Sequence, residues 1–225
     1  MSSNLPPGQR RIEGFPRFGL TRFAARFPEN PNAVKLEVGG EVESALDLSA
    51  ALRELPRVEQ VSDFHCVTTW TATSLRWGGW RYADFHERVA VSRARPKSSA
   101  RFVVLKAADG GRTILPLEHL LAEDVLLADT LNGEPLTVAH GAPLRLVAPA
   151  HYGYKSLKHL CRIEYWSDDS HWRPAAFRFM DHLEARVARE ERGRGAPGWL
   201  LRLLYRPLVK PTIALFAREL ARHTR

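Results

Sequence analysis

The spacing of apolar and polar positions predicts many short strands and few helices between residues 34 and 166. Residues 34–38 alternate strictly between apolar and polar side chains, which is typical of a half-buried strand. Other apolar, β-prone runs predict strands at 58–64, 101–107, 125–128, 144–147 and 160–166. Turn signals separate them at Gly39-Gly40, Asp109-Gly110-Gly111 and Asn132-Gly133. We expect Glu41-Val42 to begin a return strand after the first of these turns.

Helical patterns within this region are short. We expect a helix over 50–55, with Ser49 as its N-cap and Pro56 as its stop, because these residue types favour those positions. Apolar residues four apart predict a second helix over 82–89, and a third is expected over 118–122. The predicted fold class is therefore α+β, with mixed β-sheets and short helices.

The two ends of the chain differ from this middle region. Residues 1–33 are rich in Pro, Arg and Phe without a period, which indicates an extended N-terminal arm. Residues 34–179 form the expected domain, and 180–225 a basic helical C-terminal tail. In that tail, 180–192 has a charged helical pattern, and 199–220 is apolar with interleaved basic residues. Such a segment either packs on its own domain or contacts an anionic membrane or a partner.

Charge narrows the range of partners. The chain of 225 residues has a net charge of +8, which favours anionic partners. The excess is concentrated after Arg186, where arginine is dense, and not spread over one face. No nucleic-acid-binding motif is present, so we expect no nucleic-acid partner. Six tryptophans indicate either a large cofactor pocket or a tryptophan-rich core.

The cysteines bear on both location and chemistry. Cys66 and Cys161 lie too far apart in sequence to suggest a disulfide framework. The first residues lack the apolar segment of a signal peptide, and no run reaches the ~18 apolar residues of a membrane span. We therefore expect a cytoplasmic location with reduced thiols.

Cys66 follows a β-prone run and precedes polar residues, so we expect its thiol where a strand ends in a loop. A thiolate there is a soft metal ligand. Zinc and iron–sulfur sites fit poorly, because no closely spaced Cys or His pairs accompany it. A Cys–His protease would need His140 or His151 as its base, and a buried structural cysteine is the remaining alternative.

A second group of candidate residues lies about eighty positions later. His140 and Arg145 flank one glycine-containing segment, and Lys155 and Lys158 follow another. A guanidinium fork, ammonium groups and exposed backbone N–H groups suit a phosphate-type anion. The alternative is an ordinary solvated run of charges.

Read together, these segments resemble the molybdopterin-binding domain of the sulfite oxidase superfamily. The matching pieces, in chain order, are FHCVTTW (64–70), WGG (77–79), DVLLA (124–128), NGEPL (132–136), HGAPLRLV (140–147) and GYKSLK (153–158). They cover about residues 34–166. The sequence resembles small bacterial stand-alone domains and the catalytic subunit of periplasmic methionine-sulfoxide reductases.

The resemblance implies a molybdenum–molybdopterin oxidoreductase in which Cys66 is the catalytic residue and the protein's ligand to the metal. The residues it assigns to cofactor binding are His65, Cys66, His140, Arg145, Lys155, Ser156, Leu157 and Lys158. The N-terminal arm near 18–23 would add contacts, with Arg22 as a candidate.

Two departures from the family pattern bear on the substrate. Sulfite oxidases carry arginines shortly after the cysteine, where this chain has Val67, Thr68 and Thr69. The family's active-site tyrosine lies near a Ser-His-Trp stretch, but Ser170-His171-Trp172 follows two aspartates. We expect oxygen-atom transfer to or from a small, neutral or organic oxide substrate, with a separate protein exchanging electrons. The alternative is a non-catalytic module that binds a membrane or a protein through the basic tail.

Overall fold

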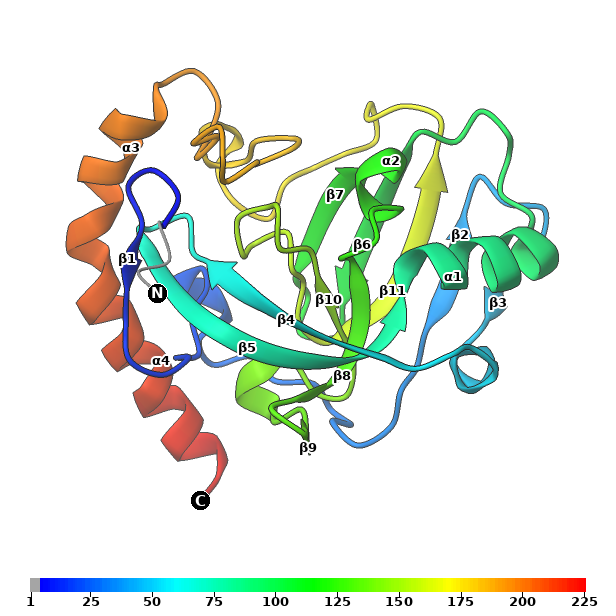
Figure 1. Ribbon diagram of the computed structural model, residues 1–225, viewed down its shortest axis with the longest axis horizontal. Helices are drawn as coiled ribbons and strands as arrows, with labels where there is room; N and C mark the ends of the chain where they lie inside the picture. The colour runs from blue at the N-terminus through cyan, green and yellow to red at the C-terminus, as the bar shows by residue number, and fades with distance from the viewer. Residues whose placement is uncertain (1–4) are drawn as a thin grey trace.

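The computed structural model describes residues 5–225, whose strands form two β-sheets (Figure 1). The first has the order β1-β5-β8-β10, with β4 also paired to β5 and β9 to β8. Its strands are β1 (Arg10–Arg11), β4 (Val58–His65), β5 (Trp70–Arg81), β8 (Leu126–Leu131), β9 (Glu134–Pro135) and β10 (Arg145–Val147). The second has the order β3-β2-β11-β6-β7. Its strands are β2 (Glu37–Gly40), β3 (Leu46–Asp47), β6 (Phe102–Ala107), β7 (Arg112–Pro116) and β11 (Leu160–Trp166). The predicted fold class, mixed sheets with short helices and a C-terminal helical tail, is confirmed.

The long antiparallel hairpin of β4 and β5 connects the two cores of the molecule. The expectation that Cys66 lies where a strand ends in a loop is confirmed, because β4 ends at His65 and residues 66–69 form a turn. The strand that follows, β5, was not predicted: it begins at Trp70 and continues for 12 residues. Trp77 is buried in the core beneath the first sheet, whereas Trp80 joins the core of the second. At Gly79 a Cβ would lie 2.1 Å from the Leu127 carbonyl oxygen, so glycine there permits the close approach of β8.

One predicted strand is shifted in the structure. Residues 34–38 were expected to form a strand that ends in a turn at Gly39-Gly40, but β2 runs through both glycines and pairs in parallel with β11. Gly40 has φ of 82°, and a Cβ there would lie 2.4 Å from the Tyr165 carbonyl oxygen. The antiparallel partner of β2 is β3 and not a strand at Glu41-Val42.

The predicted short helices are present with altered forms. Residues Ala50–Glu54 form a 3₁₀-helix, and α2 spans Leu117–Leu120. The helix expected over 82–89 is α1 (Tyr82–Phe85), which continues as a π-helix over His86–Ala94. Phe85 and Val89, the apolar pair that predicted this helix, are both buried in the larger core.

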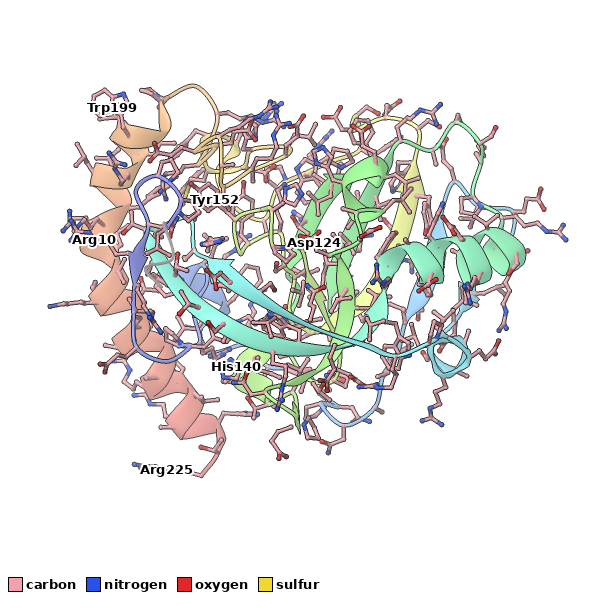
Figure 2. All side chains as sticks on the ribbon, viewed as in Figure 1. Arg10, Asp124, His140, Tyr152, Trp199 and Arg225 are labelled. Carbon is pink, nitrogen blue, oxygen red and sulfur yellow. The ribbon has the colours of Figure 1, made fainter. Side chains whose placement is uncertain are left out.

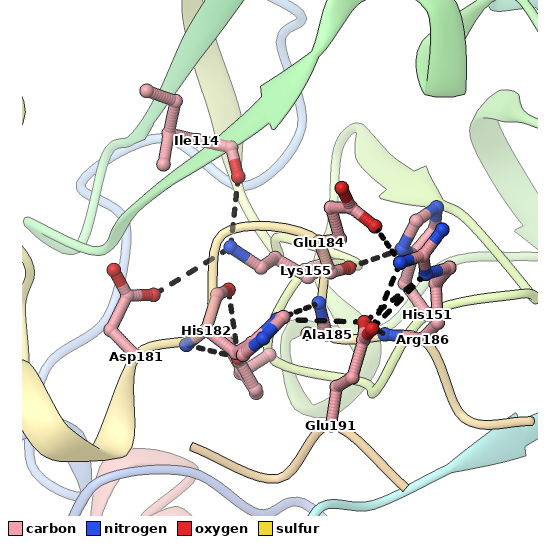
Figure 3. A network of polar contacts seen from close by, with 10 residues as sticks. Ile114, His151, Lys155, Asp181, His182, Glu184, Ala185, Arg186 and Glu191 are labelled. Atoms are coloured by element: carbon pink, nitrogen blue, oxygen red, sulfur yellow. Dashed lines mark hydrogen bonds and ion pairs between the residues drawn. The ribbon is translucent and has the colours of Figure 1, made fainter. Parts of the chain in front are cut away.

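The helix expected over 180–192 is absent, and this prediction is wrong. The segment 181–197, here called the strap, crosses the surface as turns (Figure 1). Its charged residues, which suggested the solvated face of a helix, are used as anchors (Figure 3): Arg186 pairs with Glu191 at 2.9 Å, and Asp181 lies 3.6 Å from Lys155. The strap's backbone also pairs with the domain, because Tyr152 N–H donates to the Ala185 carbonyl at 2.9 Å.

The chain ends in α3 (Gly198–Tyr205), a 3₁₀ turn over Arg206–Leu208, and α4 (Val209–His223). Pro207 and Pro211 do not interrupt this rod, because each lies near a helix start, where its missing N–H costs nothing. Figure 1 shows α3 and α4 along the end of the molecule that also holds β1, opposite α1.

The N-terminal arm packs against the C-terminal rod. Phe18 stacks on Phe216 with ring centroids 6.4 Å apart, and Phe27 stacks on His223 at 3.8 Å. Arm and tail thus form one wall of the molecule, while boundaries at 33 and 179 stay predictions. Among residues 5–225, no helix is both long and apolar enough to cross a membrane.

Candidate functional site

A cavity of about 700 Å³ lies where the β4–β5 turn, the N-terminal arm, the strap and the C-terminal helices meet. Cys66 lines it from the turn, and His140 and Lys158 line it from two loops of the domain. Tyr205 and Phe216 line it from the C-terminal rod. The site is therefore built by segments from the whole length of the chain.

The turn that carries Cys66 is fixed by its own backbone. Cys66 N–H donates to the Trp70 carbonyl at 2.8 Å, and Thr69 N–H donates to the Cys66 carbonyl at 3.1 Å. Thr69 takes a left-handed conformation with φ of 95°, which closes the turn. The thiol lies 3.1 Å from the Thr68 hydroxyl, so the hydrogen-bond partner of Cys66 is a threonine and not a histidine. The geometry therefore gives no support to a Cys–His protease.

Two side chains from the ends of the chain hold this turn from outside. The Gln9 amide donates to the Cys66 carbonyl at 3.1 Å. The Arg192 guanidinium, which is fully buried, donates to the carbonyls of Val67 and Pro7 and pairs with Glu190 at 3.2 Å. These contacts fix the backbone on both sides of the sulfur atom.

The thiol is protonated when no metal is bound. Burial raises the pKa of Cys66 to about 11, although the Thr68 hydrogen bond and the charge of Arg192 act in the opposite direction. A thiolate ligand must lose this proton, so metal binding at Cys66 would release it. The second cysteine, Cys161, is half-buried and does not line the cavity.

Arg145 and Lys158 give the cavity a cationic wall. Arg145 is fully buried and donates to the carbonyls of His140 at 2.7 Å and Ser156 at 2.9 Å, so it ties the two loops together. Burial lowers the pKa of Arg145 to about 9. Burial, followed by the charges of Arg17 and Arg145, lowers the pKa of Lys158 to about 7. An anionic ligand between these groups would relieve their mutual repulsion.

His140 is neutral at neutral pH. Its ring stacks on Phe15 with centroids 4.8 Å apart and planes within 3°. Burial, then the charges of Arg145 and Lys158, lowers the pKa of His140 to about 4. The neutral ring can both donate and accept a hydrogen bond within the cavity.

The structure brings together six of the eight residues predicted to bind a cofactor. Those that line the cavity are Cys66, His140, Arg145, Ser156, Leu157 and Lys158. Arg22 of the arm also lines it.

His65 and Lys155 do not line the cavity, so the structure does not bring them together with the other six, and their assignment as cofactor-binding residues stays a prediction. His65 Nδ1 lies 2.9 Å from the Thr71 hydroxyl, because neighbouring strand residues point to opposite faces. The Lys155 ammonium donates to the Ile114 carbonyl at 2.9 Å and faces Asp181 (Figure 3). Both side chains therefore connect segments that surround the cavity.

The strap and the C-terminal helices also contribute to the cavity, although no motif in the sequence predicted this. Tyr205 lines the cavity and is 5% exposed, and its hydroxyl has no hydrogen-bond partner among residues 5–225. Trp172 also lines the cavity and donates its indole N–H to Asp181 at 2.7 Å. Tyr205 lies 47 positions after Lys158, the end of the last matching motif, so no local signal marks it, and only the packing of α3 places it here.

The donor set of the cavity fits an anionic cofactor. Two buried N–H donors on its wall, Arg17 Nε and Trp70 Nε1, have no partner in the described structure. Within the described part of the chain, Lys158 donates a single long hydrogen bond, 3.3 Å to the Phe18 carbonyl. Across residues 5–225, no three His, Cys, Asp or Glu side chains are grouped to hold a metal ion. Cys66 therefore fits the place of one protein ligand to a metal carried by the cofactor.

Comparisons with known proteins agree on one family. Residues 24–172 match the family described as oxidoreductase molybdopterin binding domain. The chain is 38% identical over 169 residues to the uncharacterized oxidoreductase YuiH of Bacillus subtilis, a match that covers 75% of this chain and 82% of that protein. It is 28% identical over 177 residues to the protein-methionine-sulfoxide reductase catalytic subunit MsrP of Campylobacter jejuni, covering 68% of this chain and 58% of that one.

A solved structure shows the same fold. The sulfane dehydrogenase SoxCD of Paracoccus pantotrophus aligns with a TM-score of 0.52 and 22% identity, over 62% of this chain and 39% of that one. The strap and the C-terminal rod lie beyond the family segment, which ends at residue 172.

Proposed function

Since this chain belongs to the oxidoreductase molybdopterin-binding domain family and is a molybdenum-dependent oxidoreductase, we propose that it transfers an oxygen atom from a small, neutral organic oxide. The observation that carries the proposal is the cavity itself. It combines one thiol on a rigid turn with a cationic wall and an apolar wall.

In the proposal, Cys66 is the protein ligand to the metal of a molybdenum–molybdopterin cofactor. Lys158 and Arg17 bind the anionic part of that cofactor, and Arg145 holds the loops of His140 and Ser156 around it. When bound, the cofactor supplies the metal's two-electron redox chemistry. The protein supplies orientation, charge compensation and exclusion of water.

The apolar part of the cavity lining favours a neutral substrate. Val67 and Thr68 line the cavity directly after Cys66, where a sulfite site would need cationic side chains. The segment before the strap adds Trp172, Ala176 and Phe177 to the lining. The unpartnered Tyr205 hydroxyl is a donor for the oxygen of an S-oxide or N-oxide, because a buried donor without a partner gains most from a new acceptor.

The reaction needs an external reductant. The S–O or N–O bond of the substrate breaks, its oxygen leaves as water after accepting two protons, and two electrons are consumed. We propose that a separate electron-transfer protein donates these electrons. The proposal includes a cytoplasmic location, to be tested by cell fractionation, which agrees with two free cysteines.

The test is an assay of purified protein from a host that makes the cofactor. We expect molybdenum and pterin near one per chain, together with reduction of dialkyl sulfoxides or amine N-oxides by a reduced viologen dye. Sulfite oxidation with ferricyanide is the control reaction. Sulfite turnover faster than oxide reduction would contradict the substrate class, and protein without pterin would contradict the cofactor assignment.

A further inference from the structure

The outer face of α3 is unusually apolar for a solvent-exposed helix. Trp199 is 54% exposed, Leu203 56% and Leu204 60%, Leu200 is 38% exposed, and Leu208 of the following 3₁₀ turn is 51% exposed. The opposite face of the same helix buries Leu201 and Tyr205 in the domain. The helix is therefore already attached to the domain through Leu201 and Tyr205, and the outer apolar side chains are not needed for packing within the domain. Figure 2 shows Trp199 at the end of the rod, directed away from the sheets.

A basic cleft lies beside these exposed apolar residues. A pocket of about 270 Å³ between β1 and α3 is lined by Arg10, Arg202, Leu203 and Arg206. Among residues 5–225, Arg206 and Lys210 form no ion pair, whereas Arg202 pairs with Glu190 at 3.1 Å. From residue 198 to the end, the chain has six Arg or Lys residues and one Glu. The surface thus places cations directly beside exposed leucines.

We propose that the α3 face docks on an anionic phospholipid membrane. Trp199, Leu200, Leu203, Leu204 and Leu208 enter the boundary between headgroups and acyl chains, and the cleft of Arg10 and Arg206 receives a lipid phosphate. An apolar stripe flanked by cations is the pattern of helices that lie in a membrane interface. A protein partner of the same shape would need matching acidic groups, whereas a lipid surface supplies the apolar layer and the negative charge together.

Docking in this way gives the catalytic cavity a defined orientation. Leu208 both lines the cavity and is 51% exposed, and Phe177 lines it and is 74% exposed. The cavity rim therefore adjoins the face that meets the lipid. A hydrophobic substrate or electron donor dissolved in the membrane would reach the site without crossing bulk water.

The test is flotation of the full chain with lipid vesicles. We expect binding to vesicles that contain phosphatidylglycerol, little binding to vesicles of phosphatidylcholine alone, and release by 1 M salt, which shortens the screening length to about 3 Å. Arg10→Gln with Arg206→Gln should weaken partitioning roughly 30-fold, because each cation near such a surface contributes several-fold. Leu203→Ser with Leu204→Ser should weaken it about tenfold or more.

Matched controls change the same residue types elsewhere. Val61→Ser with Val91→Ser alters two exposed apolar side chains, 65% and 47% exposed, and should leave vesicle binding unchanged. Arg53→Gln with Lys35→Gln removes two exposed charges far from α3. Cofactor content and dye-linked activity in solution should be the same in all four variants, so failure of docking is distinguishable from failure of the proposed function.

Trp199 offers a direct readout, because all six tryptophans lie in the described part of the chain and it alone among them is exposed. Brominated lipids should quench protein fluorescence, and Trp199→Phe should abolish the quenching. Equal binding to neutral and anionic vesicles, or no binding, would overturn the proposal. A chain that binds no vesicle but forms a dimer dispersed by Leu203→Ser with Leu204→Ser would assign this face to a second copy instead.

Discussion

Arg192 donates a hydrogen bond to the carbonyl oxygen of Val67, the residue that follows Cys66. The two residues lie 125 positions apart, and the guanidinium reaches the turn from the strap, outside the family segment. Glu190 lies against both Arg192 and Arg202 of α3, at 3.2 and 3.1 Å. A continuous set of ion pairs and hydrogen bonds therefore runs from the surface helix to the thiol-bearing turn.

The first prediction concerns this contact. Arg192→Met leaves the Val67 and Pro7 carbonyls without a donor and Glu190 with one cation fewer, so the turn loses its outer support. We expect thermal stability to fall, by roughly 3 kcal/mol for breaking a buried pair. We also expect the molybdenum retained after gel filtration to fall severalfold.

The matched control for Arg192 is Arg194→Met, which changes an exposed arginine of the same strap. Metal content and the electron paramagnetic resonance spectrum of the partly reduced enzyme separate a positioning role from a stabilising one. A variant with lower stability but an unchanged spectrum and full metal content would show that Arg192 acts only on the fold.

The second prediction separates the metal from the rest of the cofactor. Cys66→Ser replaces the thiol by a poorer ligand of similar shape, while Lys158 and Arg145 remain. Molybdenum measured by mass spectrometry should drop to a small fraction of the parent value, and the melting temperature of the protein prepared without cofactor should change by only a few degrees. Cys161→Ser is the control. Full metal content in Cys66→Ser would contradict the ligand assignment.

Sequence motifs predicted which segments form the site, but they did not predict the direction in which each side chain points. Cys66, His140 and Lys158 each lie in a short motif that can be recognised in the sequence, and all three line the cavity. His65 and Lys155 belong to the same motifs but face away from the cavity, because a side chain's direction depends on strand alternation and on loop packing. Neighbourhood in sequence does not determine that direction.

The strap and β5 were missed for different reasons. In β5, Thr, Trp and Gly residues break the apolar alternation, since the strand passes between two cores and has both faces covered over part of its length. The strap has a helical charge pattern, but its charges pair with one another and with Lys155. Ion pairs formed across the chain are invisible to local periodicity. The position of Tyr205 also depends on contacts between distant segments, because the packing of α3 places this residue in the cavity wall.

The third prediction is a loss of stability in acid that His151 contributes. Its Nδ1 contacts the Glu184 carbonyl (Figure 3), and burial lowers the pKa of His151 to about 4. The unfolded chain takes up a proton near pH 6.5, whereas the folded chain does so only near pH 4. Stability is therefore complete above pH 6.5 and is lost as the pH falls towards 4, by about 3 kcal/mol.

Urea unfolding at several pH values between 7.5 and 4.5 measures this loss. His151→Gln keeps a donor for the Glu184 carbonyl and cannot titrate, so its free energy of unfolding should fall less steeply with pH. His171→Gln, at an exposed position, is the control and should follow the parent curve. Parallel curves for His151→Gln and the parent would show that His151 does not carry the effect.

The last prediction concerns the phenol that the C-terminal rod places in the cavity. Because the Tyr205 hydroxyl has no partner in the described structure, Tyr205→Phe removes a buried donor without breaking a hydrogen bond, and stability should hold or rise slightly. If the hydroxyl binds the substrate oxygen, kcat/KM for organic oxides should fall about tenfold, equivalent to roughly 1.4 kcal/mol. Tyr165→Phe is the opposite control: its hydroxyl lies 3.2 Å from that of Tyr82, outside the cavity, so stability should fall and kcat/KM should not. Unchanged kcat/KM in Tyr205→Phe would show that the Tyr205 hydroxyl does not bind the substrate and that α3 only forms part of the cavity wall.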